Sequence, residues 1–413
     1  MYLTFQAGAG RQRQKSQKGN GSLAVNLGIV GLGRGFMLTL PALRAHPRIK
    51  LMGAFDVRAE ARERFATEFD CLRYDSLEAL LAAPAIDAIY IATPHGLHSE
   101  QCIAAAKAGK HVLVEKPMAL QLPECDAMID AAQAAGTVLV VGPSHGFDEP
   151  VQEAAKLIAT NRFGPLRQIT AFNFTDFMYR PRHQVELDPA QGGGVVHNQA
   201  SHHFDILRRL AGQPVTEVTS LVGSWDANRR GDGAYSAFVR FRSDAAATMT
   251  YSGYGHFDSD ELMGWISELG HPKDALQHGA ARRRLTAMHG DEESRAKLAR
   301  GFGGEAGTSP DPAAAHEHFG FVLVSCERAD LRLMPDGIWI FEDDRRHFLR
   351  LPSPSGPRAG VIDELVNAVE GLCPPVQDGI WGRETVLCCE ALARSSAMGR
   401  AVSIEEIKKD KEK

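Results

Sequence analysis

Between residues 26 and 141 the chain alternates short apolar runs with longer amphipathic stretches. The runs lie at 27–30, 50–55, 88–92, 111–114 and 137–141. Short strands that are apolar throughout are typical of a parallel sheet buried on both faces, because the helices that connect parallel strands cover the sheet. The segment therefore predicts a doubly wound parallel α/β sheet, with a ligand site outside the carboxyl ends of its strands.

After residue 142 the pattern changes to longer segments in which apolar and polar residues alternate. These segments lie at 168–174, 217–222, 234–241, 246–252, 319–326 and 338–341. Such alternation predicts an open, mostly antiparallel sheet with one packed face. Helices are expected at 151–160, 201–210, 361–371 and 383–397, and residues 259–316, which lack a strand pattern, are interpreted as a helical insertion.

The composition limits what such a chain can do. The formal net charge is −5, with 46 Lys and Arg against 51 Asp and Glu, which argues against a general nucleic-acid binder. No apolar stretch approaches the ~18 residues that span a bilayer. The seven cysteines are scattered without a C-x-x-C motif, so we expect reduced thiols and a cytoplasmic protein. Residues 1–22 lack the apolar run of a secretory signal and are expected to form a disordered leader.

A glycine-rich turn follows the first apolar run, with the sequence GLGRGF at residues 31–36. Gly31 and Gly33 permit the tight turn and close backbone approach that a dinucleotide pyrophosphate needs at a helix N-terminus, although Phe36 replaces the third glycine of the usual fingerprint. Asp56, 25 positions after Gly31, ends the next strand where a carboxylate would bind the adenosine ribose. Asp56 favours NAD, but Arg58 would suit a 2′-phosphate, so NAD and NADP both remain open.

Two further motifs follow the third and fourth runs. The third run leads into ATPHGLH at residues 92–98, which places Thr93 and Pro94 beside a nicotinamide ribose. His98 is either a cofactor contact or the first residue of a helix. The fourth run leads into EKP, in which Lys116 is either a surface lysine or a buried one beside the nicotinamide. Burial would lower the pKa of its ammonium and suit it to proton exchange with a substrate hydroxyl.

A fourth motif, GGGVVHNQASHHFD, occupies residues 192–205. If a helix begins near residue 200, His202 and Asp205 lie on one face, which suits an acid/base histidine oriented by a carboxylate. Asn198 lies just before this helix. A metal site is the alternative, but His202 and His203 are adjacent and point apart, so we expect no metal.

In this order the four motifs resemble the Gfo/Idh/MocA family, which includes glucose–fructose oxidoreductase and inositol dehydrogenase. The similarity runs from about residue 27 to residue 404. It implies an N-terminal Rossmann domain at 23–145 that binds NAD or NADP, and a C-terminal substrate-binding α/β domain at 146–404. Residues 405–413 form a charged tail, and its charged run at 408–413 is expected to be frayed. The similarity also implies hydride transfer between the cofactor and a secondary alcohol, and a sheet face that forms a homodimer or homotetramer.

The resemblance also implies roles for individual residues. Lys116 matches the family lysine and His202 the family histidine, whereas Asn198 stands where many members have aspartate. Because an amide cannot take a proton, Asn198 would only hold the substrate. The residues expected around the cofactor are Gly31, Gly33, Arg34, Gly35, Phe36, Asp56, Arg58, Thr93, Pro94, His98, Glu115 and Lys116.

Two segments depart from the ordinary pattern of the family. GPSHGFD at residues 142–148 replaces an aromatic-Asn-Arg-Arg run and brings His145 to the pocket edge. The loop YRPRH at 179–183 carries Arg180, Arg182 and His183, which would either bind carboxylates or form a solvated basic loop. With Asn198 and the insertion, these features resemble the subgroup that includes phthalate 4,5-cis-dihydrodiol dehydrogenase. That resemblance implies oxidation of an anionic, carboxylated cis-diol to a catechol.

We therefore expect an NAD(P)-dependent dehydrogenase. His202 would take the hydroxyl proton, Lys116 would stabilise the developing alkoxide, and Asp205 would orient His202. The expected partners are a small-molecule substrate and further copies of the chain, with no nucleic acid and no membrane. The alternatives are a sugar or cyclitol dehydrogenase, an NAD-dependent glycoside hydrolase, and a non-catalytic cofactor-sensing regulator.

Overall fold

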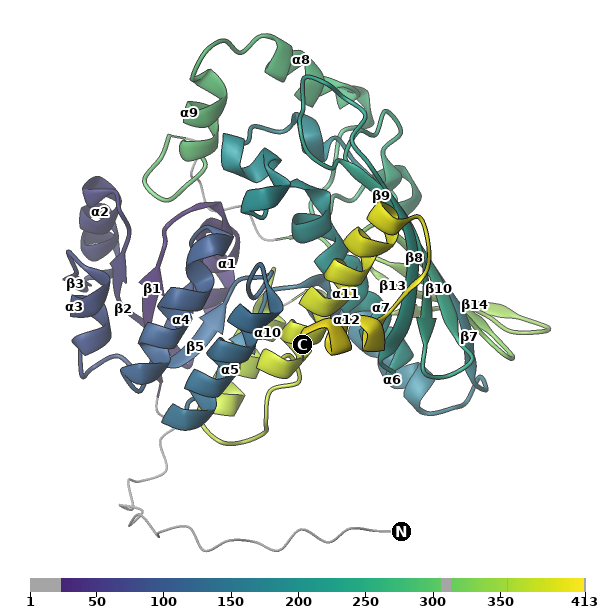
Figure 1. Cartoon of the computed structure of the whole chain (residues 1–413), viewed down its shortest axis with the longest axis horizontal. Coiled ribbons are helices and arrows are strands. Elements are labelled where there is room, and N and C mark those ends of the chain that lie inside the picture. Colours follow the sequence, from purple (N-terminus) through teal and green to yellow (C-terminus); the bar gives the residue numbers. More distant parts are fainter. Residues whose placement is uncertain (1–23, 306–312, 355, 412–413) are drawn as a thin grey trace, which may run out of the picture.

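Two β-sheets organise the computed structural model, which describes residues 24–305, 313–354 and 356–411 (Figure 1). The first sheet has six parallel strands in the order β3-β2-β1-β4-β5-β6, as the sequence predicts for a doubly wound fold. The order reverses between β1 and β4, which creates a crevice at the carboxyl ends of these strands. The strands are β1 (Val25–Val30), β2 (Ile49–Phe55), β3 (Leu72–Arg73), β4 (Ala88–Ile91), β5 (His111–Val114) and β6 (Leu139–Val141).

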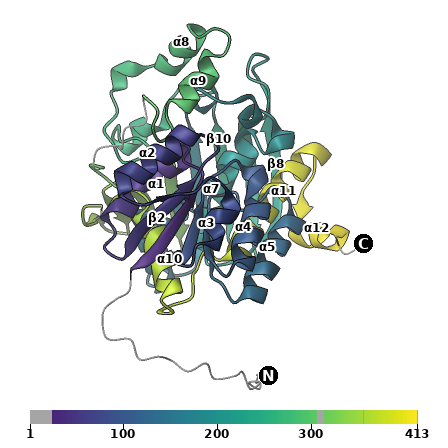
Figure 2. The same cartoon turned by 90° about the vertical axis from the view of Figure 1, so that its left-hand side faces the viewer.

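Helices cover both faces of the first sheet, because its strands are apolar on both sides. In β1, Leu27 and Ile29 face one core cluster and Val30 faces the other. One face packs against α3, α4 and α5, and the other against α1, α2 and α10; Figure 2 shows α1 and α2 apart from the group α3, α4 and α5. The helices are α1 (Arg34–Ala45), α2 (Ala59–Phe69), α3 (Leu77–Ala82), α4 (His98–Lys107), α5 (Leu122–Ala135) and α10 (Ala359–Val369).

Side chains from late in the chain complete the core on the α1 face. Phe302, from the insertion, packs at 5.8 Å from Phe36 and 5.7 Å from Phe65 between ring centroids. Helix α10 contributes four fully buried residues to the same cluster: Val361, Ile362, Leu365 and Val366. Arg48, at the end of the turn after α1, donates to Glu370 at 2.7 Å and so ties α10 to the first sheet.

The second sheet has nine strands in the order β14-β13-β12-β11-β7-β10-β9-β8-β15. Among the described strands only β7 and β10 pair in parallel, so the sheet is mostly antiparallel, as predicted. The strands are β7 (Leu166–Phe174), β8 (Val215–Gly223), β9 (Ala234–Phe241), β10 (Ala246–Ser252), β11 (Phe321–Cys326), β12 (Asp330–Met334), β13 (Gly337–Phe341), β14 (Arg346–Arg350) and β15 (Val402–Ser403).

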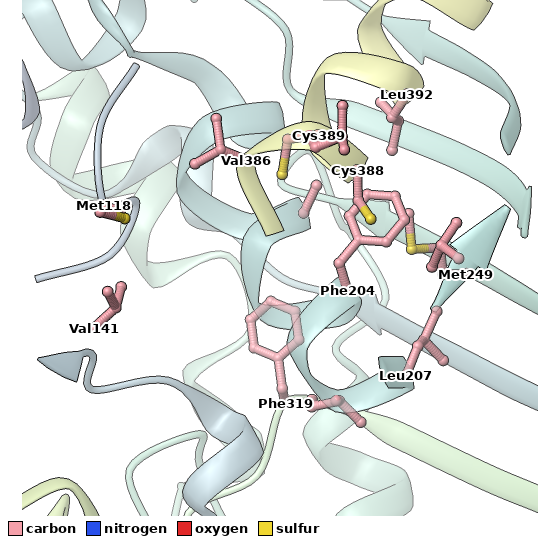
Figure 3. Close-up of a cluster of buried hydrophobic side chains, with 14 of the residues drawn as sticks. Met118, Val141, Phe204, Leu207, Met249, Phe319, Val386, Cys388, Cys389 and Leu392 are labelled. Atoms are coloured by element: carbon pink, nitrogen blue, oxygen red, sulfur yellow. The ribbon is translucent and has the colours of Figure 1, made fainter. Parts of the chain in front are cut away.

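One face of this sheet packs against α6 (Glu149–Ala159), α7 (Ser201–Ala211) and α11 (Gly379–Met398). The other face is open: β9 alternates buried residues with exposed Ser236, Phe238 and Arg240. Helix α11 also contacts α5 of the first sheet. Figure 3 shows the resulting shared core, in which Met118 and Val141 from the first sheet lie in one cluster with Phe204, Phe319 and residues of α11.

The insertion at 259–316 and the C-terminal tail are the two later segments for which the sequence predicts no strands. The insertion forms short helices, η7 (Ser259–Met263), η8 (Ala275–Gln277), α8 (Ala280–Thr286) and α9 (Glu292–Leu298). The expectation of a frayed tail is wrong for most of its length, because α12 (Ile404–Lys411) is a helix that buries Ile404 and Ile407 against the shared core. The expected leader lies outside the described residues. Within the described chain, no helix is long and apolar enough to cross a membrane.

Candidate active site

A cavity of about 580 Å³ opens at the carboxyl ends of β1, β2, β4 and β5, where the strand order reverses. Strand ends of the first sheet line one side of it, and loops and helices from later in the chain line the other, so the cavity lies between the first sheet and the elements around the start of α7. The predicted site residues that the structure brings together around it are Gly31, Gly33, Arg34, Gly35, Asp56, Arg58, Thr93, Pro94, Glu115, Lys116, His183, Asn198 and His202.

The glycine turn has the shape that a dinucleotide pyrophosphate requires. Gly31 has φ +91°, and a Cβ there would lie 2.7 Å from the carbonyl oxygen of Ala92. At Gly33, which precedes the first turn of α1, a Cβ would meet nothing within 4 Å, and no side chain of the N-cap residue caps this helix end, so there is open space beside it. The residues present therefore fit a dinucleotide, with its pyrophosphate at the start of α1.

Asp56 and Arg58, which follow β2, form a salt bridge with each other. Asp56 accepts hydrogen bonds from the backbone N–H of Leu32 at 2.7 Å and from Arg58 Nε at 2.9 Å. Burial favours the neutral carboxyl, but these hydrogen bonds and the Arg58 charge outweigh it, and the pKa of Asp56 is lowered. Arg58 Nη2 also donates to the carbonyl of Leu32 at 2.9 Å. The guanidinium is thus already engaged by protein groups.

Two predicted cofactor contacts do not line the cavity. Phe36 is fully buried against Phe65 and Phe302, so it packs α1 on its sheet. His98 is also fully buried, and its two ring nitrogens lie 3.0 Å from the carbonyl oxygens of Pro117 and Thr93. The sequence leaves open whether His98 contacts the cofactor or begins a helix. The structure supports the second alternative, because α4 begins at His98. His95, three positions earlier, lines the cavity instead.

Lys116 follows β5, and its side chain reaches the turn that precedes α7. Its Nζ donates to the carbonyl oxygen of Asn198 at 2.6 Å. Burial lowers the pKa of Lys116 to about 8; the carboxylate of Glu115 opposes this shift and the charge of Arg358 adds to it. Near neutral pH this ammonium is therefore charged but poised to lose its proton.

His202 lies in the first turn of α7 and lines the same cavity. Its Nδ1 lies 3.2 Å from Ser144 Oγ, and Nε2 has no hydrogen-bond partner among the described residues. The ring packs between Phe319, at 5.0 Å, and His145, at 4.7 Å between centroids. Burial, followed by the charges of Lys116 and His145, lowers the pKa of His202 well below its usual value. The imidazole is therefore neutral and able to accept a proton.

The prediction that Asp205 orients His202 is wrong. The carboxylate of Asp205 accepts the backbone N–H of Gly146 at 2.9 Å, Gln377 Nε2 at 3.2 Å and Trp381 Nε1 at 2.6 Å. A π-helical turn, η6 (Val196–Ala200), precedes α7, and from α7 Asp205 faces η2 (His145–Phe147) and α11 rather than the cavity. Asp205 therefore fixes the turn that carries Ser144 and His145.

Replacing Asp205 with alanine is expected to lower the free energy of unfolding by about 3 kcal/mol, because three buried N–H donors lose their acceptor. Thermal or urea denaturation measures this loss. Asp205→Asn, which keeps one acceptor oxygen, should lose less. If Asp205 acted mainly through His202, the asparagine variant would instead lose turnover while keeping its stability.

His145 and Asp148 form an ion pair beside His202. His145 Nδ1 lies 2.7 Å from Asp148 Oδ2. Burial disfavours the charged imidazole, but the Asp148 carboxylate outweighs this, so the pKa of His145 is raised. Both residues line a second cavity, of about 140 Å³, which shares His202 and Arg358 with the first. His202 therefore lies between the two cavities.

The predicted carboxylate clamp at residues 180–183 is only partly present. Arg180 Nε donates to Asp176 at 2.8 Å, and its Nη1 lies 3.4 Å from Glu268. Arg182 stacks on the ring of Phe177 at 3.6 Å and donates to Glu186. Neither arginine lines the cavity; His183 does. A protein carboxylate contacts each guanidinium, although Arg182 Nε has no hydrogen-bond partner among the described residues. Because neither side chain reaches the cavity, the two arginines do not form an anion clamp there.

Arg358, which was not among the predicted site residues, lines the cavity from the position directly before α10. Its Nη1 donates to Thr39 Oγ1 at 3.0 Å, to Glu115 Oε1 at 3.2 Å and to the carbonyl of Gly35 at 3.3 Å. Glu115 also accepts from Tyr90 at 2.6 Å. The only sequence signal was an arginine directly before an amphipathic helix, which does not indicate a partner 243 positions away.

Comparison with known protein families identifies two matching models. The oxidoreductase family with an NAD-binding Rossmann fold matches residues 25–143, and the GFO/IDH/MocA C-terminal domain matches residues 151–263. The two models follow the two sheets in chain order.

Individual relatives agree with these matches. A 1-carboxy-3-chloro-3,4-dihydroxycyclohexa-1,5-diene dehydrogenase from Comamonas testosteroni is 42% identical over 372 residues, which cover 89% of this chain and 94% of the relative. A myo-inositol 2-dehydrogenase from Thermotoga maritima is 27% identical over 58% of this chain and 73% of its own length. The crystal structure of a putative dehydrogenase from Bordetella bronchiseptica has 37% identity and a TM-score of 0.88, covering 92% of this chain and all of that one.

Proposed function

Because the chain belongs to the Gfo/Idh/MocA family of NAD(P)-dependent oxidoreductases, we propose that it oxidises a carboxylated cis-dihydrodiol to the corresponding catechol. The observation that carries this proposal is the pairing, in one cavity, of a neutral His202 with a charged Lys116 beside the glycine turn. The Comamonas relative supports the substrate class, since its name specifies a ring with one carboxyl group and two hydroxyl groups.

In this proposal residues 23–145 hold the cofactor, and His202 and Asn198 come from the domain at 146–404. A nicotinamide bound there would supply the acceptor for the hydride of the carbinol carbon. His202 takes the proton of the same carbinol hydroxyl through its unpartnered Nε2. Lys116 donates a hydrogen bond to that oxygen and stabilises the negative charge that develops on it. Asn198 donates its side-chain amide to the carbonyl of Gly194 at 2.7 Å, which fixes the loop beside the substrate.

The overall reaction balances as a two-electron oxidation. The carbinol carbon loses a hydride and its hydroxyl loses a proton, so this ring carbon becomes a ketone. A proton then leaves the neighbouring ring carbon, which bears the second hydroxyl, and another is gained by the ketone oxygen. The ring becomes aromatic in this enolisation, which makes the oxidation effectively one-directional.

The test is the formation of NADH, followed by its near-ultraviolet absorbance, with a panel of substrates. The panel holds cis-dihydrodiols with and without a ring carboxylate, inositols and aldoses, each with NAD and with NADP. We expect turnover with the carboxylated dihydrodiols and formation of a catechol. Turnover with only a sugar or an inositol would overturn the proposed substrate and leave the oxidoreductase assignment in place.

The Asp56–Arg58 pair leads to a prediction about the cofactor. We expect kcat/KM to favour NAD over NADP, because a 2′-phosphate would meet the Asp56 carboxylate while Arg58 is already engaged. Asp56→Ser should shift the NAD-to-NADP ratio towards NADP by at least about tenfold, since it removes one negative charge and frees one guanidinium. Arg64→Gln, on the exposed side of α2, is the matched control and should leave the ratio unchanged.

We further propose that the open face of the second sheet joins copies of the chain into a homodimer or homotetramer. On that face Leu221 is 65% exposed and Phe238 is 40% exposed. Large exposed apolar side chains on a sheet support an interaction surface. The free and mostly buried thiols of the described cysteines support a reducing, cytoplasmic location.

A further inference from the structure

Arg358 lies where the two cavities on either side of His202 meet. It lines both of them, and apart from His202 it is the residue that their linings share within the described chain. Its backbone has φ +60°, and its N–H donates to Glu317 Oε2 at 2.8 Å. Its side chain is 16% exposed. The guanidinium is therefore held in one place beside the base that the reaction needs.

Only one edge of this guanidinium is engaged by the protein. All its side-chain hydrogen bonds to described residues come from Nη1, which contacts Gly35, Thr39 and Glu115. Nε and Nη2 have no hydrogen-bond partner in the described part of the chain. These two N–H groups form the side of a guanidinium that can bind both oxygens of a carboxylate at once. A partly buried guanidinium with a free edge is suited to such a ligand.

The surrounding charges also suit an anion. The charge of Arg358 lowers the pKa of Lys116 and contributes to the low pKa of Arg34 and His202, so these groups lie within electrostatic range of one another. Glu115 is the carboxylate that offsets this positive charge from the side of the first sheet. On the other side, burial and the charge of Asp148 raise the pKa of Glu317, which favours its neutral form. The larger cavity is lined by five Lys and Arg side chains against three Asp and Glu side chains, so an anion that enters it meets a net positive lining.

We propose that Arg358 binds the ring carboxylate of the substrate through Nε and Nη2 and so determines specificity for carboxylated diols. This inference rests on the proposed function. It assigns to Arg358 the carboxylate-binding role that the sequence left open for Arg180 and Arg182, which do not line the cavity and donate to Asp176 and Glu186. A carboxylate held on the α10 side of His202 fixes the orientation of the ring, and thereby selects which hydroxyl group faces His202.

The test compares Arg358→Lys and Arg358→Gln with the unmodified enzyme on two substrates: a carboxylated cis-dihydrodiol and the same diol without the carboxylate. Loss of a bidentate, charge-assisted contact should raise KM for the carboxylated diol about 10- to 100-fold, with KM for the other diol changing less than about threefold. Arg358→Lys keeps a positive charge beside Glu115, so it also serves as the variant least prone to misfold. Arg350→Gln, on exposed β14, controls for the loss of a surface charge.

A binding measurement separates this role from support of the cofactor. The Kd of a carboxylated catechol for the NADH-loaded protein should rise by the same factor in Arg358→Lys, while the Kd of NADH itself stays within about threefold. The inference is overturned if both diols lose activity equally, if weaker NADH binding accounts for the loss, or if Arg180→Lys is the variant that discriminates. Failure of the unmodified enzyme to oxidise either diol would overturn the proposed function instead.

Discussion

Replacing Lys116 with methionine is expected to reduce kcat about 100- to 1,000-fold, the usual effect of removing one donor that stabilises an oxyanion in the transition state. Methionine keeps much of the side-chain volume but has no charge and no hydrogen to donate. The Kd of NAD should change little, because the glycine turn and Asp56 hold the far end of the cofactor site. Steady-state kinetics and a fluorescence titration with NADH measure the two effects.

The pH dependence of kcat/KM provides a second test of the role of Lys116. Its pKa is lowered to about 8, so the ammonium is present below that pH and is lost as the pH rises through it. We expect kcat/KM to fall above pH 8 in the unmodified enzyme. Lys116→Arg, which stays charged, should lack this alkaline fall despite a lower maximum. A profile that falls at the same pH in the arginine variant would assign the alkaline limb to another group.

Replacing His202 with alanine is expected to lower kcat/KM about 100- to 10,000-fold, the range associated with loss of a general base. The imidazole is neutral, its Nδ1 lies beside Ser144 Oγ, and its Nε2 is free to take the substrate proton. Added imidazole should restore part of the activity of the alanine variant, because the vacated volume beside Phe319 and His145 accommodates a ring.

His197→Ala is the matched control for this experiment. His197 lies on the π-helical turn just before α7 but lines a different cavity, of about 270 Å³. The segment that follows Lys116 also lines this cavity. This variant should keep its kcat/KM within a few fold and should not respond to imidazole. Equal losses in the two variants, or no rescue of His202→Ala, would contradict a base at His202.

The first sheet was predictable because its strands are continuous apolar runs that only a sheet covered on both faces can bury. The boundaries of β9 and β10 were also predicted, since buried and more exposed residues alternate along most of each strand. By contrast, β12 and β14 were missed. Arg332 interrupts the apolar residues of β12, and charged residues begin and end β14, which is an edge strand, so neither strand carries a long apolar run.

Within the site, the residues on contiguous motifs were predictable and those brought in from a distance were not. Gly31 and Lys116 follow strands whose ends must meet, so their proximity follows from the topology. Asp205 was given the wrong partner, because helical spacing places it near His202 but does not reveal the donors on α11 and on the Gly146 turn. Arg358 depends on where α10 packs, which no local pattern reports.

The contribution of Phe302 and α10 to the core on the α1 face has a consequence for how the chain matures during synthesis. All six strands of the first sheet have been synthesised once Val141 has been added, yet one face of the sheet still lacks Phe302 and α10. Phe302 follows four strands of the second sheet along the chain, and α10 follows eight. We therefore expect the nascent first sheet to keep part of this face uncovered until the later segments have been made, so that the two sheets complete their folding together.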